Sequence, residues 1–527
     1  MSERKGILKA AGVLGSATML SRILGMVRDM VVARLFGAGM ATDAFFAAFQ
    51  IPNLLRRFFA EGALTSAFVP TFSETLVQEG EERARELANL CFTLLTIVVA
   101  LVTLLGILFS PAIVKLMFPG FTAVPGKFEL TVLLNRVMFP YLFFISLVAL
   151  CMGILNTLRH FFTPAISTVF LNLSMIICAL VLRPFYQYPI TALAVGVLVG
   201  GLVQLLLQLP VLWKKGFPVR PRFAFNDPKL KKIALLLAPA TLGVGVYYLN
   251  ITVGNILASL LPQGSVSYLY YAQRLFEFPQ GVFTVSVAQA VLPAMSRQAA
   301  EGDLTAMKDS LNYGIRLTLF VTIPALVGLM VCAVPLMTLL FMGGQFDYRM
   351  SVQSANALIC YSLGLSCVAL VRVLAPAFYA LKDTRTPVIT AFISFLLNLG
   401  FSLWLMGPLQ HSGLALASSL AALGNMLLLF WLLRRKVGLL DGRKLTGAGL
   451  RALVASLPMG LLSWWLLGWL DWSLPGQKLL KSGVLAAVVT SAVVAYLLAA
   501  RVLRSEEALE ITAIIRRRVQ GPGARGQ

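Results

Sequence analysis

The sequence predicts an all-α polytopic membrane protein with fourteen transmembrane helices. Hydrophobic residues make up 58% of its 527 residues and charged residues only 13%, whereas a typical soluble domain is about 25% charged. A helix that spans a bilayer needs roughly 20 mostly apolar residues. The chain contains fourteen such runs, at about 10–36, 41–68, 87–109, 130–157, 164–182, 190–213, 233–260, 266–295, 311–341, 353–380, 387–406, 412–433, 448–470 and 480–500.

The loops between these runs differ in their content of lysine and arginine. With the N-terminus in the cytoplasm, about 29 of these residues fall on the cytoplasmic side and about 7 outside. Membrane proteins carry this excess on the cytoplasmic side, and dropping one run would reverse part of the pattern. We therefore expect a multi-pass protein whose two termini are both cytoplasmic.

The chain also repeats itself at an offset of 223–225 residues. FVPTFSE at 68–74 corresponds to VLPAMSR at 291–297, and NTLRHFFTPAIST at 156–168 corresponds to YALKDTRTPVIT at 379–390. Six spans per repeat give both halves the same orientation, so a pseudo-two-fold axis along the membrane normal should relate them. The predicted domains are an N-terminal six-helix lobe, a cytoplasmic amphipathic linker, a C-terminal six-helix lobe, and two extra helices with a basic tail, at 1–216, 217–232, 233–438 and 439–527.

No constellation for catalysis or metal binding stands out. The six cysteines form no CxxC pair, and the two histidines, His160 and His411, are far apart in sequence. No stretch matches a GxxxxGK[ST] phosphate-binding loop, and no zinc-finger or aromatic RNA-binding signature accompanies the net charge of +22. We expect no enzymatic activity, no metal, no cofactor, no nucleic-acid partner and no cleavable signal peptide.

Ionisable residues inside the apolar runs are the main functional signal. They are Arg22, Arg28, Arg34, Arg56, Arg57, Arg274, Arg316, Arg372, Asp29, Asp43, Glu61 and Glu277. Each would cost roughly 3 kcal/mol facing lipid at a helix centre, and twelve would exceed a typical fold stability of roughly 5–15 kcal/mol. These side chains must pair with one another or face water. The surplus of arginine favours a cationic cavity for an anionic substrate over structural ion pairs alone.

Motifs in the same segments resemble a known family. SRILGMVRD at 21–29, FGAGMATDAFF at 36–46, PNLLRRFFAEGALTSAFVP at 52–70 and YYAQRLFEFPQG at 270–281 are similar to the MurJ (MviN) family of lipid II flippases, in the multidrug/oligosaccharidyl-lipid/polysaccharide exporter superfamily. The resemblance implies alternating-access transport of the undecaprenyl-pyrophosphate-linked peptidoglycan precursor across the bacterial cytoplasmic (inner) membrane, for cell wall biogenesis and cell shape. It implies lipid II, membrane lipids and cell-wall synthesis proteins as partners.

The resemblance also implies site residues. It places the cavity arginines of the family at Arg22, Arg28, Arg56 and Arg274 and its acid at Asp43. Further cavity candidates are Ser21, Asn53, Arg57, Glu61, Ser267 and Glu277. The final two helices would border a groove for the lipid tail. Because no ATP-binding motif is present, the driving force would come from the membrane potential, an ion gradient or consumption of the substrate outside. One departure is Gln273, where many members carry Asp.

Two alternatives of the same superfamily stay open. One is a flippase for another prenyl-linked glycan. The other is a multidrug or cation antiporter, which would need carboxylates to bind sodium or protons. A membrane scaffold that recruits wall-synthesis proteins is a third reading, and the charged interior argues against it as the sole role.

Introduced cysteines test the predicted orientation. Cysteines at Gly80 and Gly442, on the predicted cytoplasmic side, should resist an impermeant thiol reagent in intact cells, whereas one at Gly126 should react. Labelling of all three positions would contradict the topology.

Overall fold

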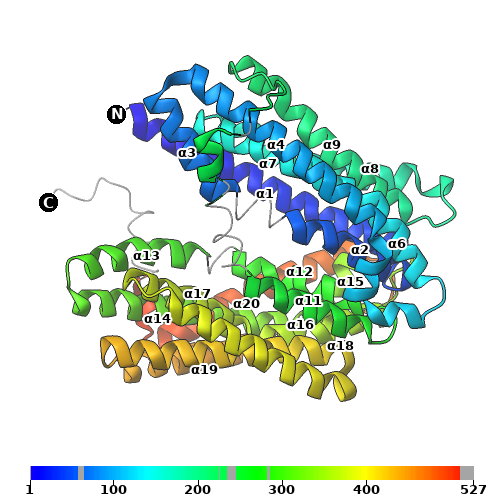
Figure 1. Ribbon diagram of the computed structural model, residues 1–527. Coiled ribbons are helices and arrows are strands. Elements are labelled where there is room, and N and C mark those ends of the chain that lie inside the picture. The colour runs from blue at the N-terminus through cyan, green and yellow to red at the C-terminus, as the bar shows by residue number, and fades with distance from the viewer. Residues whose placement is uncertain are drawn as a thin grey trace. The chain divides into compact units, whose positions relative to one another are not determined.

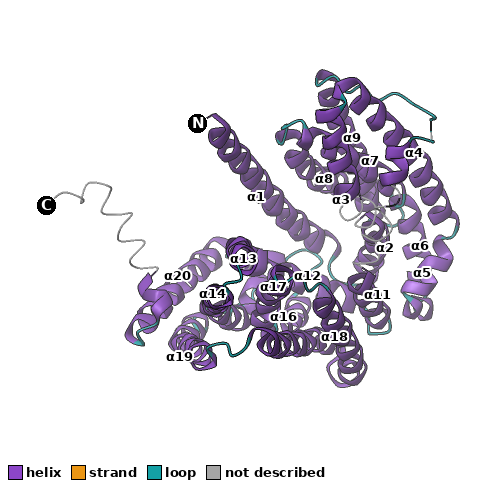
Figure 2. Ribbon diagram, turned by 60° about the vertical axis from the view of Figure 1, so that its left-hand side comes forward, coloured by secondary structure: helices purple, strands orange, loops and turns teal. Residues whose placement is uncertain are grey.

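The computed structural model describes residues 2–56, 64–224, 226–233, 235, 245–281 and 285–510. Every regular element among these residues is an α-helix or a short 3-10 helix (Figures 1 and 2). The predicted all-α class is therefore confirmed. Contacts divide the chain into two compact units, unit 1 at Met1–Ser267 and unit 2 at Tyr268–Gln527.

Unit 1 is built from long helices joined by short turns. Its elements are α1 (Ser2–Phe36), α2 (Met40–Arg56), α3 (Leu64–Gln78), α4 (Gly80–Leu108), α5 (Ser110–Met117), η2 (Pro119–Ala123), α6 (Lys127–Met138), α7 (Pro140–Thr157), α8 (Phe162–Val181), η3 (Arg183–Phe185), α9 (Thr191–Lys214) and α11 (Gly245–Ser259). Helix α8 packs against α1 and α9, and α2 packs against α6. A Cβ atom at Gly196 of α9 would lie 2.7 Å from the Cα of Met175 on α8. Glycine thus permits the close helix contact that packing in membranes favours.

Unit 2 carries most of α12 (Ser265–Pro279) and all later helices. These are α13 (Val285–Ala300), α14 (Leu304–Val331), α15 (Ala333–Phe341), α16 (Tyr348–Leu363), α17 (Leu365–Ala380), α18 (Arg385–Val437), α19 (Gly442–Leu467) and α20 (Lys478–Val502). Aspartates cap two of them: Asp303 accepts from Ala306 N at 2.9 Å and Asp347 from Met350 N at 2.7 Å. Such caps satisfy backbone groups that the first turn of a helix leaves unpaired.

The last two helices are bound firmly within unit 2. Helix α19 packs against both α14 and α20. The buried Tyr496 hydroxyl of α20 donates to the carbonyl of Phe320 on α14 at 2.6 Å. After α20, Glu506 and Glu507 pair with Arg316 of α14. Arg316, one of the charges in the predicted spans, thus has acidic partners in the segment that follows the last helix.

The number of spans stays a prediction. Eight described helices are long and apolar enough to cross a membrane, or nine if α16 and α17, which meet at 40°, form one span. The single element α18 covers two predicted spans, 387–406 and 412–433. Gln410, with φ 50° and ψ −131°, breaks the helix between them. The predicted spans 41–68 and 233–260 include residues outside the described ones.

Contacts and sequence repeats divide the chain at different places. The repeats place the boundary in the linker at 217–232, whereas unit 1 extends to Ser267, because α11 packs against α5 and η2. The linker itself is not helical at 217–224 and forms a short helix at 228–233. The division into repeat lobes rests on sequence correspondence and stays a prediction.

Candidate functional site

Asp43 lies near the start of α2 with only 1% of its surface exposed. Its carboxylate accepts from Lys127 Nζ at 2.9 Å, Gly264 N at 2.7 Å, Ser267 N at 2.9 Å and Ser267 Oγ at 2.6 Å. The structure therefore brings together two of the predicted site residues, Asp43 and Ser267. Because the backbone donors belong to the start of α12, Asp43 caps that helix from α2, where the helix dipole favours a negative charge.

The partner cation of Asp43 is Lys127, which the sequence did not single out. Lys127 is the first residue of α6 and is 2% exposed. Its Nζ lies 4.1 Å from the ring centroid of Phe121. A cation at a helix N-terminus meets an unfavourable dipole, so Asp43 supplies the charge that stabilises it. In the sequence Lys127 stands in a short loop before an apolar run, and nothing there signals a buried pair.

Arg28 is buried where α1 meets α8. Its Nη2 lies 2.7 Å from Asp29 Oδ1, and its Nη1 donates to Asn172 Oδ1 of α8 at 3.0 Å. Asn172 in turn donates to the backbone carbonyl of Ser21 at 3.3 Å. Arg28 and Ser21, both predicted, are thus joined through an asparagine that sequence reasoning missed. On the same helix, Arg22 is exposed.

Arg56 closes the described part of α2. Its Nε donates to Asn53 Oδ1 at 2.9 Å, and both side chains are half-buried. The structure therefore brings these two predicted residues together. Pro52 precedes them within the helix. Arg57 and Glu61 lie outside the described residues.

Arg274 belongs to α12, in unit 2. Its Nη2 donates to the Tyr270 hydroxyl at 3.1 Å, and the guanidinium lies 5.2 Å from the Tyr270 ring centroid. The predicted Glu277 is 3.7 Å from Arg274 Nη1 and accepts from Gln273 Nε2 at 3.1 Å. The side chains of Arg274 and Glu277 are 37% and 49% exposed. These contacts orient the guanidinium but leave part of it accessible to a ligand.

The cavity arginines and the acid that the resemblance implies therefore fall into two groups. Asp43 and Arg28 are buried and paired within unit 1, so they stabilise the packing of helices. Arg22, Arg56 and Arg274 are exposed or half-buried, so they retain surface for an anion. A guanidinium presents forked donors that match phosphate oxygens.

An apolar groove lies on α19 and α20. It is an open depression of about 710 Å³, lined by Leu462 of α19 and by Ala486, Ala487, Thr490, Ser491, Val494, Ala495 and Leu498 of α20. Small side chains form most of its α20 wall. The lining is apolar, so a hydrocarbon chain in the groove would meet surroundings as apolar as lipid tails.

A double-mutant cycle tests the buried pair. Lys127→Met should lower the free energy of unfolding by roughly 3–5 kcal/mol, since it leaves the Asp43 carboxylate buried without its cation. Combined with Asp43→Asn, the loss should be smaller than the sum of the single losses. Thermal unfolding in detergent measures it, with the exposed Lys115→Met as control. Additive losses would show that the two residues do not interact.

Comparisons with known proteins place the chain in a family. A family model described as lipid II flippase MurJ matches residues 32–480. The probable lipid II flippase MurJ of Vibrio cholerae serotype O1 is 43% identical over 436 residues, which cover 81% of this chain and 82% of that protein. The lipid II flippase MurJ of Burkholderia cenocepacia is 38% identical over 435 residues, covering 82% and 84%.

Solved structures agree with these relatives. A lipid II flippase MurJ in an inward closed conformation matches with a TM-score of 0.77 and 26% identity, covering 93% of this chain and 98% of that one. An inward-facing multidrug resistance MATE family transporter of the MOP superfamily matches with a TM-score of 0.67, covering 82% and 99%, and its 15% identity shows the fold alone. The resemblance read from the motifs is confirmed. The chain belongs to the MurJ family of lipid II flippases, which are polytopic membrane transporters and not enzymes.

Proposed function

We propose that this chain moves lipid II from the cytoplasmic to the outer leaflet of the bacterial cytoplasmic membrane by alternating access. The observation that carries the proposal is the family match over residues 32–480, together with relatives that are named as lipid II flippases at 38–43% identity. Both termini are cytoplasmic in this proposal, as the distribution of lysine and arginine indicates.

Arginines bind the pyrophosphate head in this proposal. Arg22, Arg56 and Arg274 have guanidinium surface that a ligand can reach. Arg28 is held by Asp29 and Asn172 where α1 meets α8, so it would support the site by fixing α1, the helix that carries Arg22. A charge-assisted hydrogen bond from arginine to phosphate contributes roughly 1.5–3 kcal/mol.

Asp43 acts on this site through helix α12. Both oxygens of its carboxylate accept hydrogen bonds, from Lys127, Gly264 and Ser267. Asp43 therefore supports the start of α12 and does not itself bind the head group. Arg274 follows Ser267 by two helical turns on that helix. Loss of the cap would therefore disturb the helix that carries Arg274.

The prenyl tail stays in an apolar environment throughout. The groove on α19 and α20, with a volume of about 710 Å³, offers such surroundings, and its only polar lining residues are Thr490 and Ser491.

No cofactor takes part in the proposed cycle. The pyrophosphate head is anionic, and an inside-negative potential favours its outward movement by about 2.3 kcal/mol per charge per 100 mV. The membrane potential or an ion gradient would therefore drive transport.

Conditional depletion of the protein tests the proposal. Lipid II should then accumulate in the cytoplasmic leaflet and disappear from the outer leaflet, and the wild-type gene should reverse both changes. Accumulation of a different prenyl-linked glycan in its place would identify another substrate.

Substitution of the four arginines tests the head-group site. Each of Arg22→Ala, Arg56→Ala and Arg274→Ala should lower lipid II translocation about tenfold or more, since roughly 1.5–3 kcal/mol of binding is lost. Arg28→Ala should lower translocation through the contact of α1 with α8 that it removes. Arg→Lys variants keep the charge but lose the fork, so they separate charge from geometry. Translocation is measured beside the level of membrane-inserted protein. If all four alanine variants have a normal level of membrane-inserted protein and normal translocation, these arginines do not form the head-group site.

A bulky side chain in the groove tests the tail site. Ala487→Trp should reduce translocation, because the indole would occupy the groove that Ala487 lines. Val489→Trp is the matched control, since Val489 lies on the same helix, is 48% exposed and does not line the groove. Equal activity of the two variants would argue against a required tail groove.

A further inference from the structure

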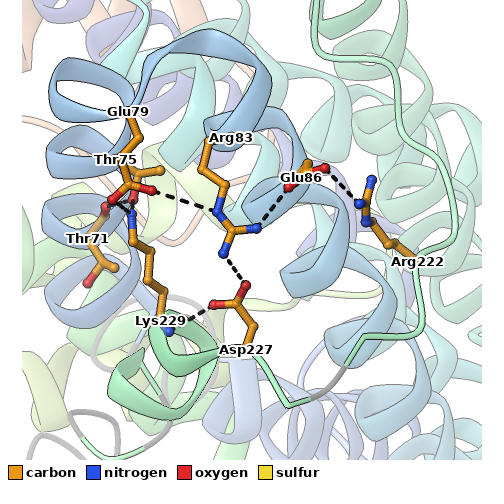
Figure 3. A network of polar contacts seen from close by, with 8 residues as sticks. All are labelled: Thr71, Thr75, Glu79, Arg83, Glu86, Arg222, Asp227 and Lys229. Atoms are coloured by element: carbon orange, nitrogen blue, oxygen red, sulfur yellow. Dashed lines mark hydrogen bonds and ion pairs between the residues drawn. The ribbon is translucent and has the colours of Figure 1, made fainter.

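A network of ion pairs joins the linker to the end of α3 and the start of α4 (Figure 3). Arg83 is at its centre. Its Nη2 lies 2.5 Å from Asp227 Oδ2 and its Nη1 lies 2.8 Å from Glu86 Oε2, and the other oxygen of Glu86 is 2.7 Å from Arg222 Nη2. Lys229 donates to Thr75 Oγ1 at 2.9 Å and pairs with Glu79. The linker thus supplies both signs of charge, and the helices supply their complements.

Asp227 is the most deeply placed charge of this network, with 6% of its side chain exposed. Burial raises the pKa of its carboxyl, but hydrogen bonds from the backbone N–H of Lys229 and from Arg83 outweigh burial and hold the pKa below its usual range. Asp227 is therefore ionised at neutral pH and depends on Arg83 for its charge partner. Without Arg83, this carboxylate would lose its charge partner, and detachment of the linker from α4 would cost less free energy.

Backbone contacts extend the attachment along α4. Arg220 N donates to Asn89 Oδ1 at 3.0 Å, and Arg222 N donates to Thr93 Oγ1 at 2.9 Å. The linker at 217–224 has no helical hydrogen bonds of its own. Its path is therefore set by side chains of α4.

The chain after the linker returns to unit 1 at a second place. Gly120 N of η2 donates to Ser259 Oγ at the end of α11 at 3.2 Å. A Cβ atom at Gly120 would lie 2.1 Å from the Ser259 carbonyl oxygen, so glycine is needed for this contact. Asp43 then binds Gly264 and Ser267. Polar contacts near both ends of the segment 217–267 thus bind it to the earlier helices of unit 1.

We propose that Arg83 is a positioning residue of the transport cycle, and that its pair with Asp227 keeps the linker bound to α4 throughout that cycle. The linker and α4 then move as one body. This inference rests on the proposed lipid II transport, because its effect is read as transport. Arg83 touches no substrate in it and acts only by holding the linker in place.

Single substitutions give the first test. Arg83→Ala and Asp227→Ala should each reduce lipid II translocation about fivefold, the factor that corresponds to about 1 kcal/mol at 1.4 kcal/mol per tenfold change. Lys232→Ala is the matched control: it removes a linker ion pair to Glu74 of 3.0 Å whose side chains are 53% and 47% exposed, and it should leave translocation unchanged. Wild-type translocation in Arg83→Ala would overturn the proposal.

Release of the linker is measured without transport. Leu230 of the linker is 5% exposed, so a cysteine in its place should react slowly with a thiol reagent in membranes. Its labelling should accelerate when Arg83→Ala is added and not when Lys232→Ala is added, after subtraction of labelling in the parent protein. Unchanged labelling would show that Arg83 does not hold the linker. This readout stays valid even if the wild-type protein fails to move lipid II, which would refute the proposed function alone.

A covalent link decides whether the linker must stay or leave. Cysteines at Glu79 and Lys229, joined by a short bismaleimide, replace the ion pair between them. Translocation by the linked protein should equal that of the unlinked double variant, and the link should restore transport to Arg83→Ala. Loss of transport on linking would show that the linker leaves α4 during the cycle, which would overturn the proposal.

Discussion

A charge inside an apolar helix bundle has no bulk water to stabilise it, and much of this structure follows from how each charge is matched. Asp43 binds Lys127 and the start of α12, and Arg28 binds Asp29 and Asn172. The contacts of Asp43 with Lys127 and of Arg28 with Asn172 join helices that are far apart in sequence. Leaving one partner of such a pair unmatched costs several kcal/mol, so these contacts fix which helices lie together.

The same constraint separates framework from binding surface. A fully matched charge has little capacity left for a ligand, because its hydrogen-bonding positions are occupied. Asp43 is in that state, whereas Arg274 is held by Tyr270 and Glu277 with 37% of its side chain exposed. Residues that motifs place in one site can therefore have different tasks. Asp43 supports a helix, and Arg274 presents a guanidinium from that helix.

Sequence alone could predict what depends on local pattern. The apolar runs predicted an all-α membrane protein, and quoted motifs identified the family. It could not predict Lys127 as the partner of Asp43, because that pair joins positions 84 residues apart and Lys127 looks like a loop residue. The spacing of Ser267, Arg274 and Glu277 puts them on one face of a helix, yet Ser267 is buried and Glu277 is exposed. The helical period gives the side of the helix on which a residue lies, but it does not tell which other elements pack against that side at each turn.

The division into units has a physical consequence for transport. The repeat boundary is the position where the second copy of the repeated sequence starts. The contact boundary is the position where the contacts of the chain with unit 1 end, at Ser267. Between the two lie the linker, α11 and the first turn of α12, bound to unit 1 through α4, η2 and Asp43. A motion that displaced this segment would break several charge-assisted contacts at once. A motion that leaves these contacts intact costs less free energy. We therefore expect α11, the first helix of the second repeat, to move together with the first repeat.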